Sequence, residues 1–145
     1  MITVQQLLKE KGRDIWSIAP QASVYEALQL MADKNAGALL VLDNGKLVGI
    51  FSERDYARKG ILKNKSSKDT PVSALMTKKI CVIDSQATME TCMHLMTDKH
   101  IRHLPVTENN QLVGVISIGD VVKQVISDQK FTIQELEKYI SGSYA

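Results

Sequence analysis

Two stretches of the sequence place a glycine, a serine and an aspartate at one spacing that could serve phosphate and sugar binding. The sets are Gly49, Ser52 and Asp55, then Gly114, Ser117 and Asp120. A serine at a helix start lies beside free N–H groups and the positive end of the helix dipole, which favour a phosphate. A carboxylate three residues later can accept two hydrogen bonds from the cis-diol of a ribose. The glycines would allow close backbone approach by a ligand.

The same serine and aspartate have a structural interpretation. Ser-x-x-Asp at a strand-to-helix junction is close to a capping box, which stabilises a helix start with no ligand present. From the motif alone the two interpretations weigh about equally, and capping and binding can coexist.

Both motifs belong to an internal repeat. Sliding the chain against itself by 65 residues aligns positions 15–55 with 80–120 without a gap, and sixteen of the forty-one positions are identical. A fixed period means one supersecondary unit used twice, and a unit this short cannot bury its apolar face alone. The two copies are therefore expected to pack on each other.

Each copy shows the same order of patterns. Apolar stretches at 15–18 and 80–83 predict strands, and Ser23 and Thr88 are good N-caps for the helical spacing that follows. Runs at 38–42 and 47–52 predict a hairpin, as do runs at 103–107 and 112–117. A last helix is expected over 54–62 and over 119–128. The predicted fold class is α/β (α+β), with tandem β-α-β-β-α repeats.

Three segments lie outside the repeats, which we assign to 15–64 and 80–128. Residues 1–14 are an N-terminal lead-in with an amphipathic helix over 3–11, and residues 65–79 are a polar linker ending in a helical turn over 72–76. Residues 129–145 are a tail with an amphipathic helix over 132–141, begun by a capping box of Thr132 and Glu135. Its apolar residues Ile133, Leu136 and Ile140 need a partner, either their own domain or a second protomer.

Composition excludes several classes of function. The chain has a formal net charge of only +2, so it lacks the strong positive field that is typical of nucleic-acid-binding proteins. No apolar run approaches the roughly 20 residues of a membrane helix, and no signal peptide is visible, so we expect a cytoplasmic protein without a membrane partner.

The reactive side chains form no recognisable active site. Cys81 and Cys92 have no metal or CxxC spacing, which predicts free thiols in the core. The three histidines are too scattered for a metal centre, and neither motif serine has a histidine or lysine beside it in sequence to act as a base. We therefore expect no enzyme, no catalytic residue and no metal.

The tandem repeats, each with Leu-Val-Gly-x-x-Ser-x-x-Asp where its last strand meets its last helix, resemble the CBS domain pair, or Bateman module. The resemblance covers residues 15–128, and the stretches SERDYARK, RHLPV and SIGDVVK are similar to those of small stand-alone CBS-pair proteins. It implies a pseudo-twofold module with two clefts between the repeats for ligands such as AMP, ADP, ATP, NAD or S-adenosylmethionine. It also implies a homodimer that senses its ligand without transforming it.

The resemblance and the apolar pattern together assign the adenine base to the strands of each repeat. The expected base and cleft-wall residues are Ser17, Ile18, Ala19, Ala38, Leu39, Gly49, Ile50, Val82, Ile83, Leu104, Gly114 and Val115. Apolar walls with backbone polar groups suit a flat purine. Each of these residues is also a core candidate, and core packing is the main role of Ile18, Leu39, Ile83 and Leu104 in either case.

Positive charge is distributed unequally around the two motifs. The expected phosphate ligands are Ser52, Ser117, Arg54, Arg102 and His103, since arginine can hold a phosphate through two parallel hydrogen bonds. The repeat equivalents of Arg54 and Arg102 are both glycines, which predicts two non-equivalent clefts. Arg58 and Lys59 fit an ordinary solvated helix face slightly better than a site.

The function expected from these observations is a regulatory sensor of adenosine-containing ligands. Glu53 and Asp84 add negative charge near the phosphate path, which disfavours a triphosphate and favours AMP or a dinucleotide. AMP is the first choice, and ATP and NAD are the other candidates. The alternative is a dimeric protein-interaction scaffold with vestigial clefts, and either role requires an effector protein that the sequence does not identify. An enzyme or a nucleic-acid binder comes last.

Overall fold

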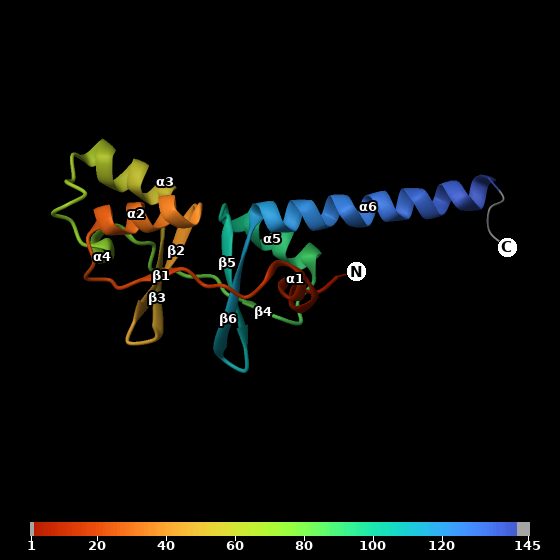
Figure 1. Ribbon diagram of the computed structural model, residues 1–145, viewed down its shortest axis with the longest axis horizontal. Helices are drawn as coiled ribbons and strands as arrows, with labels where there is room; N and C mark the ends of the chain where they lie inside the picture. Colours follow the sequence, from red (N-terminus) through yellow and green to blue (C-terminus); the bar gives the residue numbers. More distant parts are fainter. Residues whose placement is uncertain (1, 142–145) are drawn as a thin grey trace. The chain divides into compact units, whose positions relative to one another are not determined.

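The structure, a computed structural model, describes residues 2–141 and divides the chain into two compact units (Figure 1). Asp14–Cys81 forms the first, which we call the Ser52 unit. Residues 2–13 and 82–141 form the second, which we call the Ser117 unit. Each holds one three-stranded sheet with helices against it, which confirms the predicted class of two β-α-β-β-α repeats.

The Ser52 unit contains the first repeat. Its elements are β1 (Ser17–Ile18), α2 (Val24–Lys34), β2 (Ala38–Asp43) and β3 (Lys46–Ser52). Strand β1 runs parallel to β2, and β2 pairs antiparallel with β3. The hairpin turn is Asn44-Gly45, with φ of 52° and 83°, as a tight two-residue turn requires.

The Ser117 unit repeats this order. Its elements are β4 (Ile83–Asp84), α5 (Met89–Lys99), β5 (His103–Glu108), β6 (Gln111–Ser117) and α6 (Ile118–Ser141). The predicted caps are confirmed, because Ser23 and Thr88 accept hydrogen bonds from the backbone of Glu26 and Thr91. The first strands are shorter than the apolar stretches predicted, since only two residues of each pair with the neighbouring strand.

The segment before each repeat packs on the other repeat. Helix α1 (Val4–Lys11) belongs to the Ser117 unit, where the Val4 amide donates to the Ala87 carbonyl at 2.9 Å. Helix α4 (Val72–Leu75) belongs to the Ser52 unit, where the Val72 amide donates to the Ala22 carbonyl at 2.8 Å. Ala22 and Ala87 are 65 residues apart, so the two helices hold equivalent places.

Both helices contribute to the cores. The core of the Ser52 unit includes Val72 and Leu75 from α4 together with Phe51 from β3. In the Ser117 unit, α1 buries Val4, Leu7 and Leu8. Cys92 is buried as predicted, and burial raises the pKa of its thiol to about 11. Cys81 is a free thiol as predicted, but its predicted core position was wrong, because this residue is only half-buried at the end of the Ser52 unit.

The helices after the two motifs differ from the predicted 54–62 and 119–128. In the Ser52 unit the helix is irregular, with α3 (Glu53–Asp55), a π-helical turn η1 (Tyr56–Gly60) and a 3₁₀ turn η2 (Ile61–Lys63). In the Ser117 unit, α6 continues through Ser141, so the two predicted helices are one. Thr132 therefore begins no helix; its hydroxyl donates to the Asp128 carbonyl one turn earlier. Tail residues 142–145 lie outside the described residues.

Among residues 2–141, no helix combines the length and the hydropathy of a membrane-spanning segment.

Candidate functional site

The serine and aspartate of each motif cap their helix reciprocally. The Asp55 amide donates to Ser52 Oγ at 3.1 Å, and the Ser52 amide donates to Asp55 Oδ2 at 3.0 Å. The same two bonds join Asp120 and Ser117 at 3.2 and 2.9 Å. The capping interpretation is therefore confirmed at both motifs, while ligand binding by these residues stays a prediction.

A lysine and a threonine hold the Asp55 carboxylate in the Ser52 unit. Lys59 Nζ lies 3.1 Å from Asp55 Oδ1, and the Thr77 hydroxyl donates to the same oxygen at 3.0 Å. Lys59 is 46% exposed, as its predicted place on a solvated helix face requires, but its amine also contacts Asp55 and donates to the Leu75 carbonyl at 3.3 Å. Arg58 is exposed as predicted.

The Asp120 carboxylate also holds a lysine, but from the other end of the chain. Lys11, the last residue of α1, places Nζ 2.5 Å from Asp120 Oδ2 and 2.8 Å from the Val115 carbonyl oxygen. The position equivalent to Lys59 is Gln124, which bonds to Asp128 instead. Each motif thus pairs its aspartate with one lysine, supplied by different elements.

The two carboxylates differ in accessibility. Both oxygens of Asp55 accept hydrogen bonds within the Ser52 unit, and the side chain is 12% exposed. At Asp120 the contacts within the Ser117 unit converge on Oδ2, and the side chain is 25% exposed. Asp120 is therefore the more available acceptor.

Basic residues gather around Asp120. His103 begins β5 directly opposite Ser117, and exposed Arg102 precedes it. Burial lowers the pKa of His103, and the positive charges of Lys11 and Arg102 lower it further against the opposing effect of Asp120. His103 is thus a neutral imidazole near pH 7, available as a hydrogen-bond donor.

Asp120 itself stays ionised. Burial acts to raise its pKa, but the hydrogen bonds from Lys11 and Ser117 and the charge of Lys11 outweigh burial and hold the pKa below the ordinary value. An ionised carboxylate beside Lys11 and His103, with Arg102 next to His103, offers both an acceptor for hydroxyl groups and donors for an anion.

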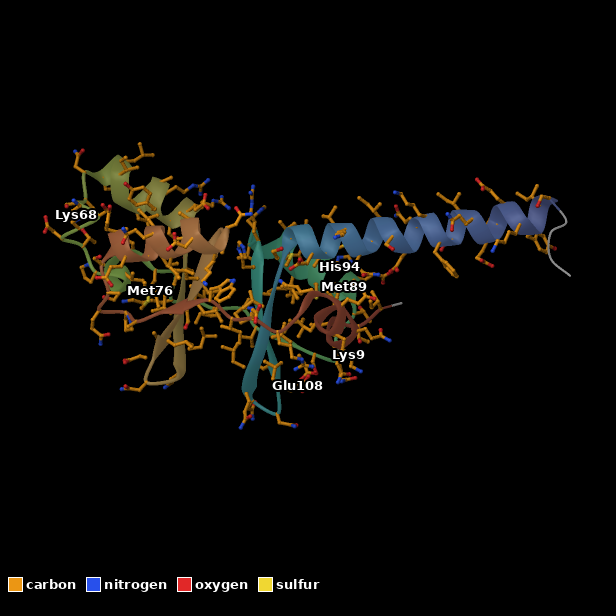
Figure 2. All side chains as sticks on the ribbon, viewed as in Figure 1. Lys9, Lys68, Met76, Met89, His94 and Glu108 are labelled. Atoms are coloured by element: carbon orange, nitrogen blue, oxygen red, sulfur yellow. The ribbon has the colours of Figure 1, made fainter. Side chains whose placement is uncertain are left out.

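The motif glycines pack against neighbouring side chains. Met76 lies in the Ser52 unit (Figure 2). A Cβ on Gly49 would stand 2.6 Å from its Sδ atom. A Cβ on Gly114 would stand 2.9 Å from Leu8 Cδ2 of α1. Packing of α1 against Gly114, and of the end of α4 against Gly49, therefore accounts for both glycines. A ligand contact at Gly49 or Gly114 stays a prediction that these contacts do not support.

The expected base and wall residues divide into core and accessible positions. Leu39, Ile83 and Leu104 are 1%, 6% and 0% exposed, which confirms core packing as their role. The half-buried or exposed positions are Ser17, Ile18, Ala19, Ala38 and Ile50 in the Ser52 unit, and Val82 and Val115 in the Ser117 unit. These seven are the expected contact positions that retain accessible surface.

The Ser52 unit carries its cations at different places from the Ser117 unit. Ala38 lies opposite Ser52, where the other unit has His103 opposite Ser117. Arg54 is exposed two residues after Ser52. Within the described part of the chain, no group of three or more His, Cys, Asp or Glu side chains could share a metal ion.

Lys11 and Thr77 are site residues that sequence reasoning missed. Lys11 reaches Asp120 over 109 residues, and Thr77 reaches Asp55 over 22. The segments VQQLL and VSALM, at 4–8 and 72–76, have similar patterns, which could have suggested that their helices hold equivalent places, but no signal points to Lys11 or Thr77 themselves.

A family model identifies the repeats. The model described as the CBS domain matches the chain twice, over residues 4–60 and 72–127. The chain belongs to the CBS domain family. Its CBS repeats therefore correspond to the two β-α-β-β-α units, and the first match includes α1, which packs in the Ser117 unit.

Curated and solved proteins carry the same CBS pair. The CBS domain-containing protein CBSX3, mitochondrial, of Arabidopsis thaliana is 38% identical over 152 residues, which cover 98% of this chain and 73% of that protein. The structure of a protein with CBS domains from Burkholderia ambifaria MC40-6 is 47% identical, with a TM-score of 0.85 over 88% of this chain and 96% of its own.

A more distant CBS pair was solved with ligands. The CBS domain pair of protein MJ0100, in complex with 5′-methylthioadenosine and S-adenosyl-L-methionine, has a TM-score of 0.78 over 88% of this chain and 98% of its own. Its identity of 22% shows a shared fold.

Proposed function

We propose that this CBS pair is a regulatory module that binds an adenosine-containing ligand, without catalysis, through its Ser-x-x-Asp motifs. The observation that carries the proposal is the ionised, partly exposed Asp120 among Lys11, Arg102, His103 and Ser117. A ribose diol needs an acceptor, and a phosphate needs donors with positive charge. The Ser117 unit supplies both within one group of residues.

The proposal ranks the two motifs. The contacts of Asp120 within its unit use only Oδ2. At Asp55, by contrast, a ribose must compete with Lys59 and Thr77 for Oδ1 and with Ser52 for Oδ2. The ligand is therefore expected to fill the Asp120 site first. Lys11 would leave Asp120 for the ligand phosphate, which couples occupancy to the position of α1.

AMP is the proposed ligand, with ATP and NAD next. One phosphate matches the positive charges of Lys11 and Arg102 in the unit of Ser117, while exposed Asp84 in the same unit disfavours a larger negative charge. The ligands named for the MJ0100 pair share the adenosine moiety. The expected base contacts are the accessible wall positions, Val82 and Val115 in this unit.

The first test is a thermal-shift and calorimetry panel of AMP, ADP, ATP, NAD, S-adenosylmethionine, 5′-methylthioadenosine and GMP. A ligand at about 100 times its Kd that binds only the folded protein adds about 2.7 kcal/mol of stability. Stabilisation by AMP but not by GMP is expected. A flat panel, confirmed by calorimetry, would reject the sensor and leave a protein-interaction scaffold.

The site assignment has its own test. Asp120→Asn keeps a cap acceptor but loses the charge, so AMP affinity should fall about 10- to 100-fold, in line with a charged hydrogen bond of about 1.5–3 kcal/mol. Asp55→Asn should have a smaller effect on the first binding event. The exposed Asp69→Asn is the matched control. Equal affinity in Asp120→Asn and Asp69→Asn would show that AMP binds elsewhere.

A further inference from the structure

Helix α6 carries a stripe of side chains that the described chain leaves exposed. Its members alternate in spacing by four and three residues: Val122, Ile126, Gln129, Ile133, Leu136 and Ile140. The five apolar members are 44%, 47%, 54%, 56% and 82% exposed. We call this set the α6 stripe. Isolated exposed apolar residues are normal on a protein surface, but a continuous row of them marks an interaction face.

The Ser117 unit does not cover the stripe. Helix α6 packs against α5 and β6 through its first half, where Val121 is buried. Figure 1 shows the second half of α6 extending past the other elements of this unit. After Asp128 every described residue except half-buried Glu135 is exposed.

We propose that the α6 stripe binds the α6 stripe of a second copy of this chain, side by side and antiparallel. Alternating spacing of four and three residues produces the narrow seam of a two-helix coiled coil. A second copy presents a face with the same spacing and length. This inference is independent of the proposed ligand.

The charges beside the stripe select the orientation. Lys123, Lys130 and Glu137 occupy one edge, seven residues apart. In an antiparallel pair this edge meets the same edge of the partner, so that lysine can face glutamate. In a parallel pair it would meet the opposite edge, occupied by Val125, Thr132 and Tyr139, with no ion pair.

Burial of the whole stripe selects the register. Setting Val122 opposite Ile140 of the second copy aligns Ile126 with Leu136 and brings all five apolar residues into contact. The overlap spans residues 122–140, about 27 Å of helix at about 1.5 Å per residue. The same register places Lys123 beside Glu137 at both ends. A shift by one heptad would pair Lys130 with Glu137 but leave Val122 without a partner.

Two features near the centre oppose tight binding. In this register Gln129 of each copy lies opposite Ile133 of the other copy, near the middle of the paired helices. A polar residue in the apolar contact between two helices lowers the stability of the pair while it fixes the register. The two Lys130 side chains come near each other, although both are exposed and screened by water. The expected pair is therefore reversible.

The first experiment is sedimentation of the full chain with a matched pair of variants. Ile133→Glu introduces a charge into the stripe, whereas Phe131→Glu changes another exposed apolar residue on a different face of the same helix, 64% exposed. Ile133→Glu should weaken self-association at least about 100-fold, and Phe131→Glu should leave it unchanged. A monomeric wild-type chain, or equal effects of the two variants, would overturn the proposal.

Charge reversal then tests the orientation and the register. Lys123→Glu and Glu137→Lys should each weaken association about tenfold, because each turns two ion pairs into two repulsions, and the double variant should restore it. Lys138→Glu, outside the stripe and this edge, is the control. Restoration by Lys130→Glu with Glu137→Lys, but not by the 123/137 double variant, would overturn the register.

Chemical crosslinking provides a readout that does not depend on affinity. In a Cys81→Ser background, a mixture of Val122→Cys and Ile140→Cys proteins treated with a short bis-maleimide should give a crosslinked heterodimer. Neither protein alone should crosslink, because residues 122 of the two copies lie at opposite ends. Crosslinking of Val122→Cys alone would mean a parallel pair and overturn the proposal.

Discussion

Lys11 controls the titration of Asp120. Its hydrogen bond leads the influences that hold the pKa of Asp120 below the ordinary value against burial. Lys11→Met should raise that pKa, as seen by NMR of the carboxyl carbon during a pH titration. The ionised Asp120 contributes stability above its unfolded pKa of about 3.9 and loses it as the pH falls through the lower folded value. Lys11→Met should weaken that acid dependence, while the hydrogen bonds from Ser117 remain.

The cost of Lys11→Met at neutral pH should be small. The two side chains are 32% and 25% exposed, so water screens the pair and its contribution is below about 1 kcal/mol. Lys9→Met, on the same helix (Figure 2), is the control because the structure shows no such contact for it. An unchanged Asp120 titration in Lys11→Met would contradict the assignment.

His103 is expected to produce a second pH dependence. Burial lowers its folded pKa, so between that value and the unfolded value of about 6.5 the unfolded chain binds more protons. The free energy of unfolding should therefore fall as the pH drops below about 6.5. Urea unfolding at several pH values should show this slope in the wild type and a shallower one in His103→Gln. An equal slope in both, with exposed His94→Gln as the comparison, would refute the role of His103.

Local residue pairs were predictable from sequence and distant ones were not. The Ser-x-x-Asp caps follow from a separation of three residues, which places the side chain beside the backbone amide in any helix start. Lys11 and Asp120 meet only because α1 docks beside β6 and α6, and no periodicity within either segment encodes that docking.

At the scale of elements, α1 docking depends on the absence of a side chain at Gly114. A Cβ there would meet Leu8 Cδ2 at 2.9 Å and Leu8 Cδ1 at 3.0 Å, and Leu8 is only 1% exposed. Gly114→Ala should therefore destabilise the protein by about 1–3 kcal/mol in urea unfolding, the usual range for overpacking.

Gly119→Ala is the matched control. A Cβ at Gly119 would meet only Ser117 Oγ, at 3.6 Å, in the first turn of α6. Alanine there should be neutral or stabilise by up to about 1 kcal/mol, because it favours the helix. Equal losses in both variants would mean that contact with α1 is not the reason for glycine at 114.

The elements themselves were largely predictable, while their partners and lengths were less so. Helices α1 and α4 were both expected, but their equivalence was not. Val4 lies fourteen residues before Ile18, whereas Val72 lies eleven residues before Ile83, so the 65-residue offset that aligns the repeats does not align these two helices. Helix α6 was divided because Thr132 resembles an N-cap. It continues because no glycine or proline lies between Asp120 and Ser141 to end it.

At the scale of the whole molecule, the Ser117 unit is assembled from two separate segments. A fragment of residues 82–141 lacks the buried Val4, Leu7 and Leu8, so it should unfold with little cooperativity when monitored by circular dichroism. Adding a peptide of residues 1–13 should restore a cooperative transition, and the same peptide with Leu8→Glu should not. A fragment that melts identically with and without the peptide would show that α1 is dispensable.

The separation of α1 from the rest of its unit also sets an order of events during synthesis. Every element of the Ser52 unit lies within Asp14–Cys81, so this unit can fold as soon as Cys81 has left the ribosome. Helix α1 emerges earlier still, yet the strands and helices that cover its apolar face are translated last. Until then the apolar face of α1 stays uncovered, and a chaperone could bind it. The Ser117 unit can form only when its two segments meet, with the whole Ser52 unit as the loop between them.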